Sequence, residues 1–186
     1  MTDEIDNPVT GERIRFLRRD GATRAEPLRM DFSVAPHGFV AAPHVHPHQG
    51  ERSSVDAGVI TFRIGGRDVR VATGQSVTVP PGTPHVWSNP SDQDARVLVE
   101  LQPALRMEPF FRQWFGLARD GKVDAHGMPS LLQLAVVMRE YRNEIQPPVL
   151  LQRLLLVPLA FVARLMGYRA NDPRYQSAES GGSLPA

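Results

Sequence analysis

Between residues 14 and 102 the chain alternates between apolar and polar residues in short runs. In the runs 28–34, 60–64, 68–72 and 97–101 every second residue is apolar, and glycine or proline follows each run closely. This period of two is typical of strands with one buried face. Gly65 and Gly66 separate two of the runs and favour a hairpin turn. Many short antiparallel strands at this spacing predict a mainly β fold, either a sandwich or a barrel.

After Pro103 the spacing of the apolar residues becomes helical. Four aromatic residues fall at i, i+1, i+4 and i+5, close behind a proline suited to a helix start: Phe110, Phe111, Trp114 and Phe115. Ser130 is expected to cap a second helix, and a third helix is expected from Pro147-Pro148 to about Gly167. The chain therefore divides into an N-terminal arm (1–11), a barrel (12–104), a helical extension (105–168) and a tail expected to be disordered (169–186).

The predicted third helix contains an uninterrupted apolar run, residues 154–163. A membrane-spanning helix needs about 20 apolar residues. Arg153 and Arg164 bracket this shorter run and Pro158 interrupts it. We therefore expect no membrane contact, and predict that the helix packs against the barrel or at a homodimer interface. An interfacial membrane helix is the alternative.

Composition narrows the chemistry further. The chain of 186 residues has no cysteine, so metal ligands would have to be histidine and carboxylate. A formal net charge of +1 with scattered basic residues gives no reason to expect nucleic-acid binding. The acidic, polar N-terminus does not resemble a signal or transit peptide, and a cytoplasmic location is expected.

Three of the six histidines lie in the stretch HVHPHQGE, residues 44–51. His44 and His46 are two apart, so on a strand they face the same side. Glu51 is an odd number of residues from both, and would face that side only if the chain turned at Pro47 and Gly50. The rigid turn PPG at 80–82 could bring His85 to the same place.

These residues carry a family resemblance. The first cupin motif, G-x5-H-x-H-x4-E-x6-G, is matched at every position by Gly38, His44, His46, Glu51 and Gly58. The second, G-x5-P-x-G-x2-H-x3-N, is matched by Gly74, Pro80, Gly82, His85 and Asn89. The chain resembles a single-domain cupin, a double-stranded β-helix or jelly-roll-like barrel, followed by about three C-terminal helices.

The resemblance implies one divalent metal ion held by His44, His46, Glu51 and His85. Nitrogen and oxygen ligands without sulfur suit Fe, Mn, Ni, Cu or Zn. Some cupins keep the fold and lose the metal, but here no ligand of the motif is replaced. The other three histidines are expected at the surface: His37, His48 and His126.

The parity of the strands predicts an apolar barrel lining around the ion, made of Met30, Phe32, Ile60, Phe62, Val97 and Val99, with Trp87 near His85. No tyrosine precedes Tyr141, so the barrel lacks the tyrosine acid of the related sugar epimerases and the Cys-Tyr pair of thiol dioxygenases. We predict a metal-dependent oxygenase or isomerase acting on a small apolar enol or phenol. Glu51 would be catalytic, and substrate would contact Trp87, Ser53, Phe62 and Met30.

Two other functions fit the same residues. One is a non-catalytic module, a sensor or storage protein, that binds such a small molecule. In the other, the barrel is a scaffold and the helices join subunits or touch a membrane. Nothing in the sequence separates the enzyme from the binding module.

Overall fold

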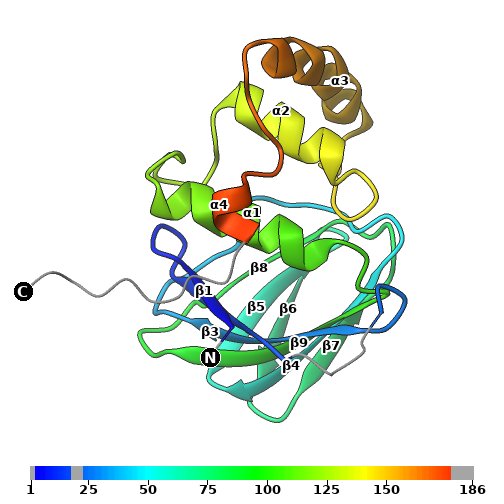
Figure 1. Ribbon diagram of the computed structural model, residues 1–186. Coiled ribbons are helices and arrows are strands. Elements are labelled where there is room, and N and C mark those ends of the chain that lie inside the picture. The colour runs from blue at the N-terminus through cyan, green and yellow to red at the C-terminus, as the bar shows by residue number, and fades with distance from the viewer. Residues whose placement is uncertain (1–2, 18–22, 177–186) are drawn as a thin grey trace, which may run out of the picture.

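Two antiparallel sheets face each other in the computed structural model, which describes residues 3–17 and 23–176 (Figure 1). The larger sheet has six strands in the order β1-β2-β3-β9-β4-β7, and the smaller has three in the order β6-β5-β8. The strands are β1 (Glu4–Asn7), β2 (Glu12–Phe16), β3 (Leu28–Val34), β4 (Gly50–Ala57), β5 (Val59–Ile64), β6 (Arg67–Ala72), β7 (Ser76–Val79), β8 (His85–Ser88) and β9 (Ala95–Gln102). The predicted mainly β barrel is confirmed.

The alternation seen in the sequence places apolar side chains between the sheets. In β2 and β9 every second residue is buried. Phe32 of the larger sheet meets Trp87 of the smaller one edge to face, with ring centroids 5.6 Å apart. Phe62 lies opposite Trp87 on the neighbouring strand. Aromatic contacts thus join the two sheets and fix their faces relative to each other.

Helices cover one end of the barrel. Figure 1 shows α1 (Met107–Arg119) lying across the strands, with α2 (Leu131–Glu140) and α3 (Leu150–Leu165) stacked beyond it. The Ser130 side chain accepts a hydrogen bond from the Gln133 backbone at 3.4 Å and caps α2, as its sequence position predicts. Gly167 takes a φ of +87° just after α3, a conformation that favours glycine.

Only one face of α3 is buried. Leu156, Ala160 and Ala163 pack inward, whereas Phe161 and Leu165 are 67% and 75% exposed. The expected packing of the helix is therefore met on its inner face alone. Within the described residues, no helix has both the length and the apolar character that crossing a membrane requires.

The two ends of the described chain differ from the expected arm and tail. Residues 4–7 form β1, which pairs with β2 in the larger sheet. Residues 173–176 form a short helix, α4 (Pro173–Gln176), and Tyr175 packs against Gly116 of α1. A Cβ atom at Gly116 would lie 2.3 Å from the Tyr175 ring, so this contact requires glycine. Residues 177–186 of the expected tail lie outside the described residues.

Candidate metal centre

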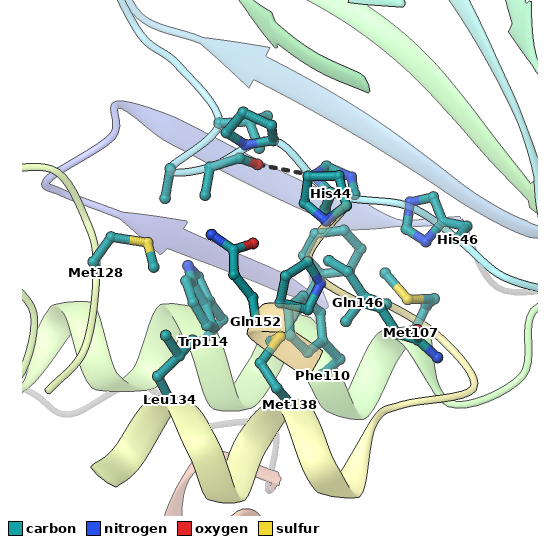
Figure 2. Close-up of a pocket in the computed structure, with 18 of the residues that line it drawn as sticks. His44, His46, Met107, Phe110, Trp114, Met128, Leu134, Met138, Gln146 and Gln152 are labelled. Atoms are coloured by element: carbon teal, nitrogen blue, oxygen red, sulfur yellow. Dashed lines mark hydrogen bonds between the residues drawn. The ribbon is translucent and has the colours of Figure 1, made fainter. Parts of the chain in front are cut away.

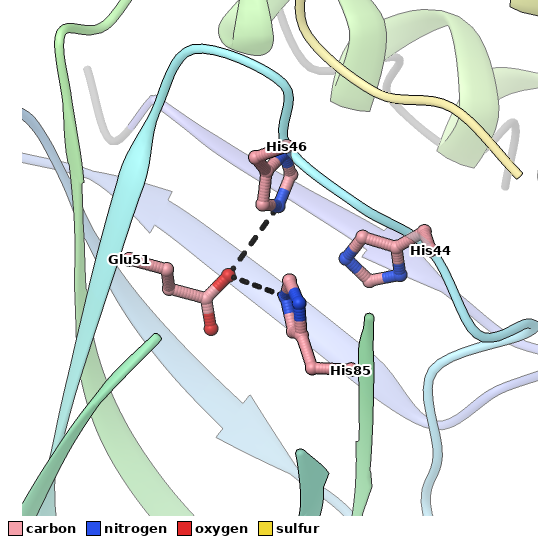
Figure 3. Close-up of side chains that lie close together, drawn as sticks. All are labelled: His44, His46, Glu51 and His85. Carbon is pink, nitrogen blue, oxygen red and sulfur yellow. Dashed lines mark hydrogen bonds and ion pairs between the residues drawn. The ribbon is translucent and has the colours of Figure 1, made fainter. Parts of the chain in front are cut away.

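Four side chains from three parts of the chain converge inside the barrel (Figure 3). His44 and His46 precede β4, Glu51 lies near the start of β4, and His85 begins β8. One potential ligand atom from each lies within 4.8 Å of the others. Oε2 of Glu51 is 3.4 Å from Nε2 of His46 and 3.3 Å from Nε2 of His85. The four residues form a candidate metal site.

Backbone pairing explains how distant residues meet. His44 and His85 form an isolated antiparallel bridge with two backbone hydrogen bonds, of 3.0 and 2.9 Å. Directly opposed residues in such a bridge have side chains on the same face, so the two imidazoles become neighbours. The chain then turns at Pro47 and His48 before β4 starts at Gly50. Because of this turn Glu51 points into the barrel, whereas on a continuous strand it would point to the opposite face.

The buried side chain of Gln49 holds this turn in place. Its amide nitrogen donates to the carbonyl oxygens of Pro103 and Ala104, at 2.8 and 3.1 Å. The turn is therefore tied to the end of β9.

Each imidazole is oriented by a backbone carbonyl on its outer side. Nδ1 lies 3.0 Å from the Ala42 oxygen in His44, 2.7 Å from the Glu144 oxygen in His46 and 3.0 Å from the Thr83 oxygen in His85. A carbonyl only accepts, so each Nδ1 carries the proton, and a neutral ring then has its lone pair on Nε2. This outer support of histidine is typical of metal sites.

The electrostatics of the cluster suit a cation. Burial acts to raise the pKa of Glu51, but its close contacts with the His46 and His85 rings outweigh burial and hold that pKa well below its ordinary value. Burial, with His85 and His46 nearby, lowers the pKa of His44 well below its ordinary value. Three imidazole nitrogens and an ionised carboxylate therefore face one point.

A cavity of about 510 Å³ opens beside this cluster (Figure 2). Its walls are the mouth of the barrel on one side and α1, α2, α3 and the 145–149 segment on the other. His44, His46 and Glu51 line it at the barrel side. The remaining lining is mostly aromatic and aliphatic, including Phe110, Trp114 and Met138. An apolar ligand could thus lie against the candidate metal site, as in typical small-molecule pockets.

The structure separates the predicted substrate-binding residues. Trp87 lines the cavity, as do Phe32 and Val99. Met30 and Phe62 are fully buried and belong to the core beneath it, together with Ile60 and Val97. These four residues face the barrel interior as predicted, but they do not line this cavity. Parity identified the inward face of each strand but could not show how deep the side chains fill the barrel.

Ser53 lies beside Glu51 on β4. It is 1% exposed, and its hydroxyl donates to Oε1 of Glu51 at 3.1 Å. It therefore positions Glu51, and its contact with a substrate stays a prediction. His48, His37 and His126 are exposed, as predicted.

The helical wall of the cavity and two acidic residues near it were not predicted from the sequence. The apolar residues of the helices were predicted as packing surfaces only. The backbone carbonyl of Glu144 accepts a hydrogen bond from Nδ1 of His46, and Glu12 lines the cavity. A signal for Glu12 was available, because it shares the inward parity of Ile14 and Phe16.

Comparison with known proteins supports the resemblance. A family model described as "Cupin domain" matches residues 30–100, which contain all four candidate ligands. The chain is 32% identical over 156 residues to a Hypocrea virens protein named "Probable oxidoreductase virH". That alignment covers 76% of this chain and 71% of the relative.

The chain belongs to the cupin family. Among solved structures, this cupin is similar to an RmlC-like cupin from Shewanella frigidimarina, with 19% identity, 56% of this chain and 86% of that chain covered, and a TM-score of 0.48. A sugar phosphate isomerase of the cupin superfamily from Silicibacter pomeroyi is 20% identical, with 52% of this chain covered and a TM-score of 0.46. The match spans 62% of that isomerase. At these values the two structures say nothing about activity.

Proposed function

We propose that this cupin holds one divalent metal ion between His44, His46, Glu51 and His85. The observation that carries the proposal is the outer hydrogen bonding of the three imidazoles, which turns every Nε2 lone pair toward the Glu51 carboxylate. Lone pairs and a carboxylate repel one another unless a proton or a cation lies between them. Fe, Mn, Ni, Cu or Zn would fit this donor set.

The metal assignment is tested by a matched pair of histidine variants. Protein purified without chelator or nickel resin is expected to contain one metal ion per chain by elemental analysis. His46→Ala should abolish that content, because it removes a buried donor at the centre. His48→Ala should leave it unchanged, since His48 is exposed in the turn. Equal losses in both variants would contradict the assignment.

We further propose a metal-dependent oxygenation or isomerisation of a small apolar enol or phenol. A bound divalent ion would supply Lewis acidity and, if redox-active, a means of engaging dioxygen. The chain itself offers a mostly apolar cavity beside the cluster, with Trp87 as a flat wall for a planar substrate. The relative named as a probable oxidoreductase supports this class of reaction.

Glu51 is the residue proposed to move a proton. Its Oε2 faces His46 and His85, while Oε1 accepts from Ser53, so the two oxygens have different surroundings. We propose that this carboxylate takes the hydroxyl proton of the substrate and returns it, while Ser53 keeps the carboxylate in place.

The catalytic proposal is tested with Glu51→Gln. Glutamine can occupy the same position but cannot take a proton, so the variant should keep its metal and lose turnover. The assay follows dioxygen uptake and product formation with a panel of enolic and phenolic compounds under air. Glu100→Gln, which changes a carboxylate paired with Arg29 away from the cluster, is the matched control. Wild-type protein that binds a compound tightly and converts none would instead be a binding module.

A further inference from the structure

A second buried carboxyl lines the cavity away from the candidate metal site. Glu12 of β2 stands in the inward series Glu12, Ile14 and Phe16, where the other two members are apolar core residues. It is 6% exposed and belongs to the cavity wall. Its Oε2 accepts a hydrogen bond of 2.7 Å from the Thr10 hydroxyl. An inward glutamate at an otherwise apolar position requires an explanation.

Support of the local turn does not explain Glu12. The turn between β1 and β2 is already held by Asn7, whose side-chain oxygen accepts from the backbone nitrogens of Val9 and Thr10 at 3.1 and 3.2 Å. Within residues 3–17 and 23–176, no cation is hydrogen-bonded or ion-paired with Glu12; its partner there is Thr10. The carboxyl therefore stands at the cavity wall with one neutral partner.

The position of Glu12 is at the far end of the cavity from His46. Gly127 packs against Thr10, because a Cβ atom on it would lie 2.7 Å from the Thr10 methyl group. Gly127 is followed by Met128, which lines the cavity. In Figure 2, Met128 and His46 lie on opposite sides of the cavity. The cavity thus has a polar group near each end, and the walls between them are apolar apart from Gln146 and Gln152.

The buried carboxyl is suited to neutral ligands. Burial raises the pKa of Glu12 to about 8, against a smaller lowering by the Thr10 hydrogen bond. At neutral pH the group is then mainly a carboxylic acid, which can donate one proton as well as accept. Since Thr10 donates to Oε2, Oε1 is the oxygen that would carry the proton toward a ligand.

We propose that Glu12 and Thr10 form a second ligand-binding point, which hydrogen-bonds a neutral carbonyl or hydroxyl oxygen at the distal end of an elongated apolar ligand. The other end of that ligand reaches the His44, His46, Glu51 and His85 cluster. The inference rests on the proposed function for its ligand class, and it adds the distal oxygen and the length of the molecule. If an apolar group of the ligand lay there instead of an oxygen, the proton of the buried acid would be left without a hydrogen-bond partner, and this would weaken binding.

The test uses two isosteric probes and four proteins. The first probe is a para-hydroxybiphenyl with a para-acetyl group on its second ring, and the second carries an isopropyl group in place of the acetyl. Wild type should bind the acetyl probe about tenfold more tightly, which corresponds to one buried hydrogen bond. Glu12→Met should bind both probes equally, and Glu12→Gln, which can still donate, should keep the preference. Glu4→Met, an exposed glutamate on β1, is the control and should behave as wild type.

The ratio of the two affinities is the decisive reading, since a purely structural role of Glu12 would change both affinities alike. Quenching of the two tryptophans, Trp87 and Trp114, reports binding because both line the cavity. If wild type binds both probes with equal affinity, the Glu12 assignment is overturned and the proposed function stands. If wild type binds neither probe, both proposals fall. A Glu12→Met protein that keeps the tenfold preference also overturns the assignment.

Discussion

Two buried glutamates of this cupin have pKa values shifted in opposite directions. Close contacts with the His46 and His85 rings overcome burial at Glu51 and lower its pKa, whereas at Glu12 burial prevails over one hydroxyl and raises the pKa to about 8. Glu51 is 4% exposed and Glu12 is 6% exposed, so burial alone does not distinguish them. The neighbours decide which carboxyl is ionised.

The raised pKa of Glu12 predicts a pH dependence of stability. The folded state binds this proton more tightly than the unfolded state, whose carboxyl has the ordinary value of 4.5. The contribution of this bound proton to the unfolding free energy is therefore complete at low pH and is lost as the pH rises toward about 8. Relative to Glu12→Gln, the unfolding free energy of wild type should fall by up to about 1.4 kcal/mol per pH unit between these values. Urea unfolding of both proteins at several pH values measures this, and parallel curves would contradict it.

At the scale of elements, the loop after α2 belongs to the candidate metal centre. The carbonyl of Glu144 in this loop accepts from Nδ1 of His46, and Val45 forms a backbone bridge to Gln146. Arg106, just before α1, ties the loop down by donating to the side chains of Glu140 and Glu144 at 2.8 and 3.1 Å. The helical extension therefore orients a candidate ligand and is more than a cover.

Arg106→Leu is expected to weaken metal binding although Arg106 touches no candidate ligand. Without Arg106, the buried side chain of Glu144 loses its cationic partner, and the Glu144 carbonyl that orients His46 is held less firmly. Supporting residues of this kind change metal affinity by about tenfold or more. Competition with a chelator measures the affinity. Arg142→Leu, whose side chain bonds only to a neighbouring carbonyl among the described residues, is the control and should keep wild-type affinity. Equal metal affinities in the two variants would show that the hydrogen bonds of Arg106 do not influence the metal site.

At the scale of the molecule, the outer face of α3 is a large apolar surface. Leu150, Leu154, Phe161 and Leu165 are each more than half exposed. The two arginines of the helix have partners: Arg153 donates to the carbonyl of Pro147, and Arg164 pairs with Glu140. Monomeric proteins rarely leave such a continuous apolar face in water.

We therefore keep the prediction of a homodimer and assign it to this face. A second copy of α3 would cover the apolar residues, because a twofold interface places one surface against itself. Wild type should sediment as a dimer, and the double variant Leu154→Glu with Phe161→Glu should sediment as a monomer. Val69→Glu changes an exposed apolar residue of β6 and should leave the dimer intact. A monomeric wild type would refute the assignment, and binding to phospholipid vesicles would then favour the interfacial helix.

The sequence by itself determined most strands of the barrel, though not β1, together with the three long helices and the identity of the cluster. Period-two runs place side chains on one face of a strand whatever lies beyond it, so Leu28–Val34 and its partners were predictable locally. The same holds for the Ser130 cap and for Gly167 after α3. The cupin motifs named His44, His46, Glu51 and His85 because their spacing reflects a fixed turn and a fixed bridge.

Tertiary structure alone decided what surrounds that cluster. Met30 and Phe62 share the parity of Phe32, yet they fill the core while Phe32 lines the cavity, because depth in the barrel depends on both sheets and on the helices above. The carbonyl that holds His46 comes from a residue 98 positions away. Glu12 gains its raised pKa from burial under segments distant in the chain. Local sequence patterns predict which way a side chain faces, but only tertiary packing determines which groups it contacts there.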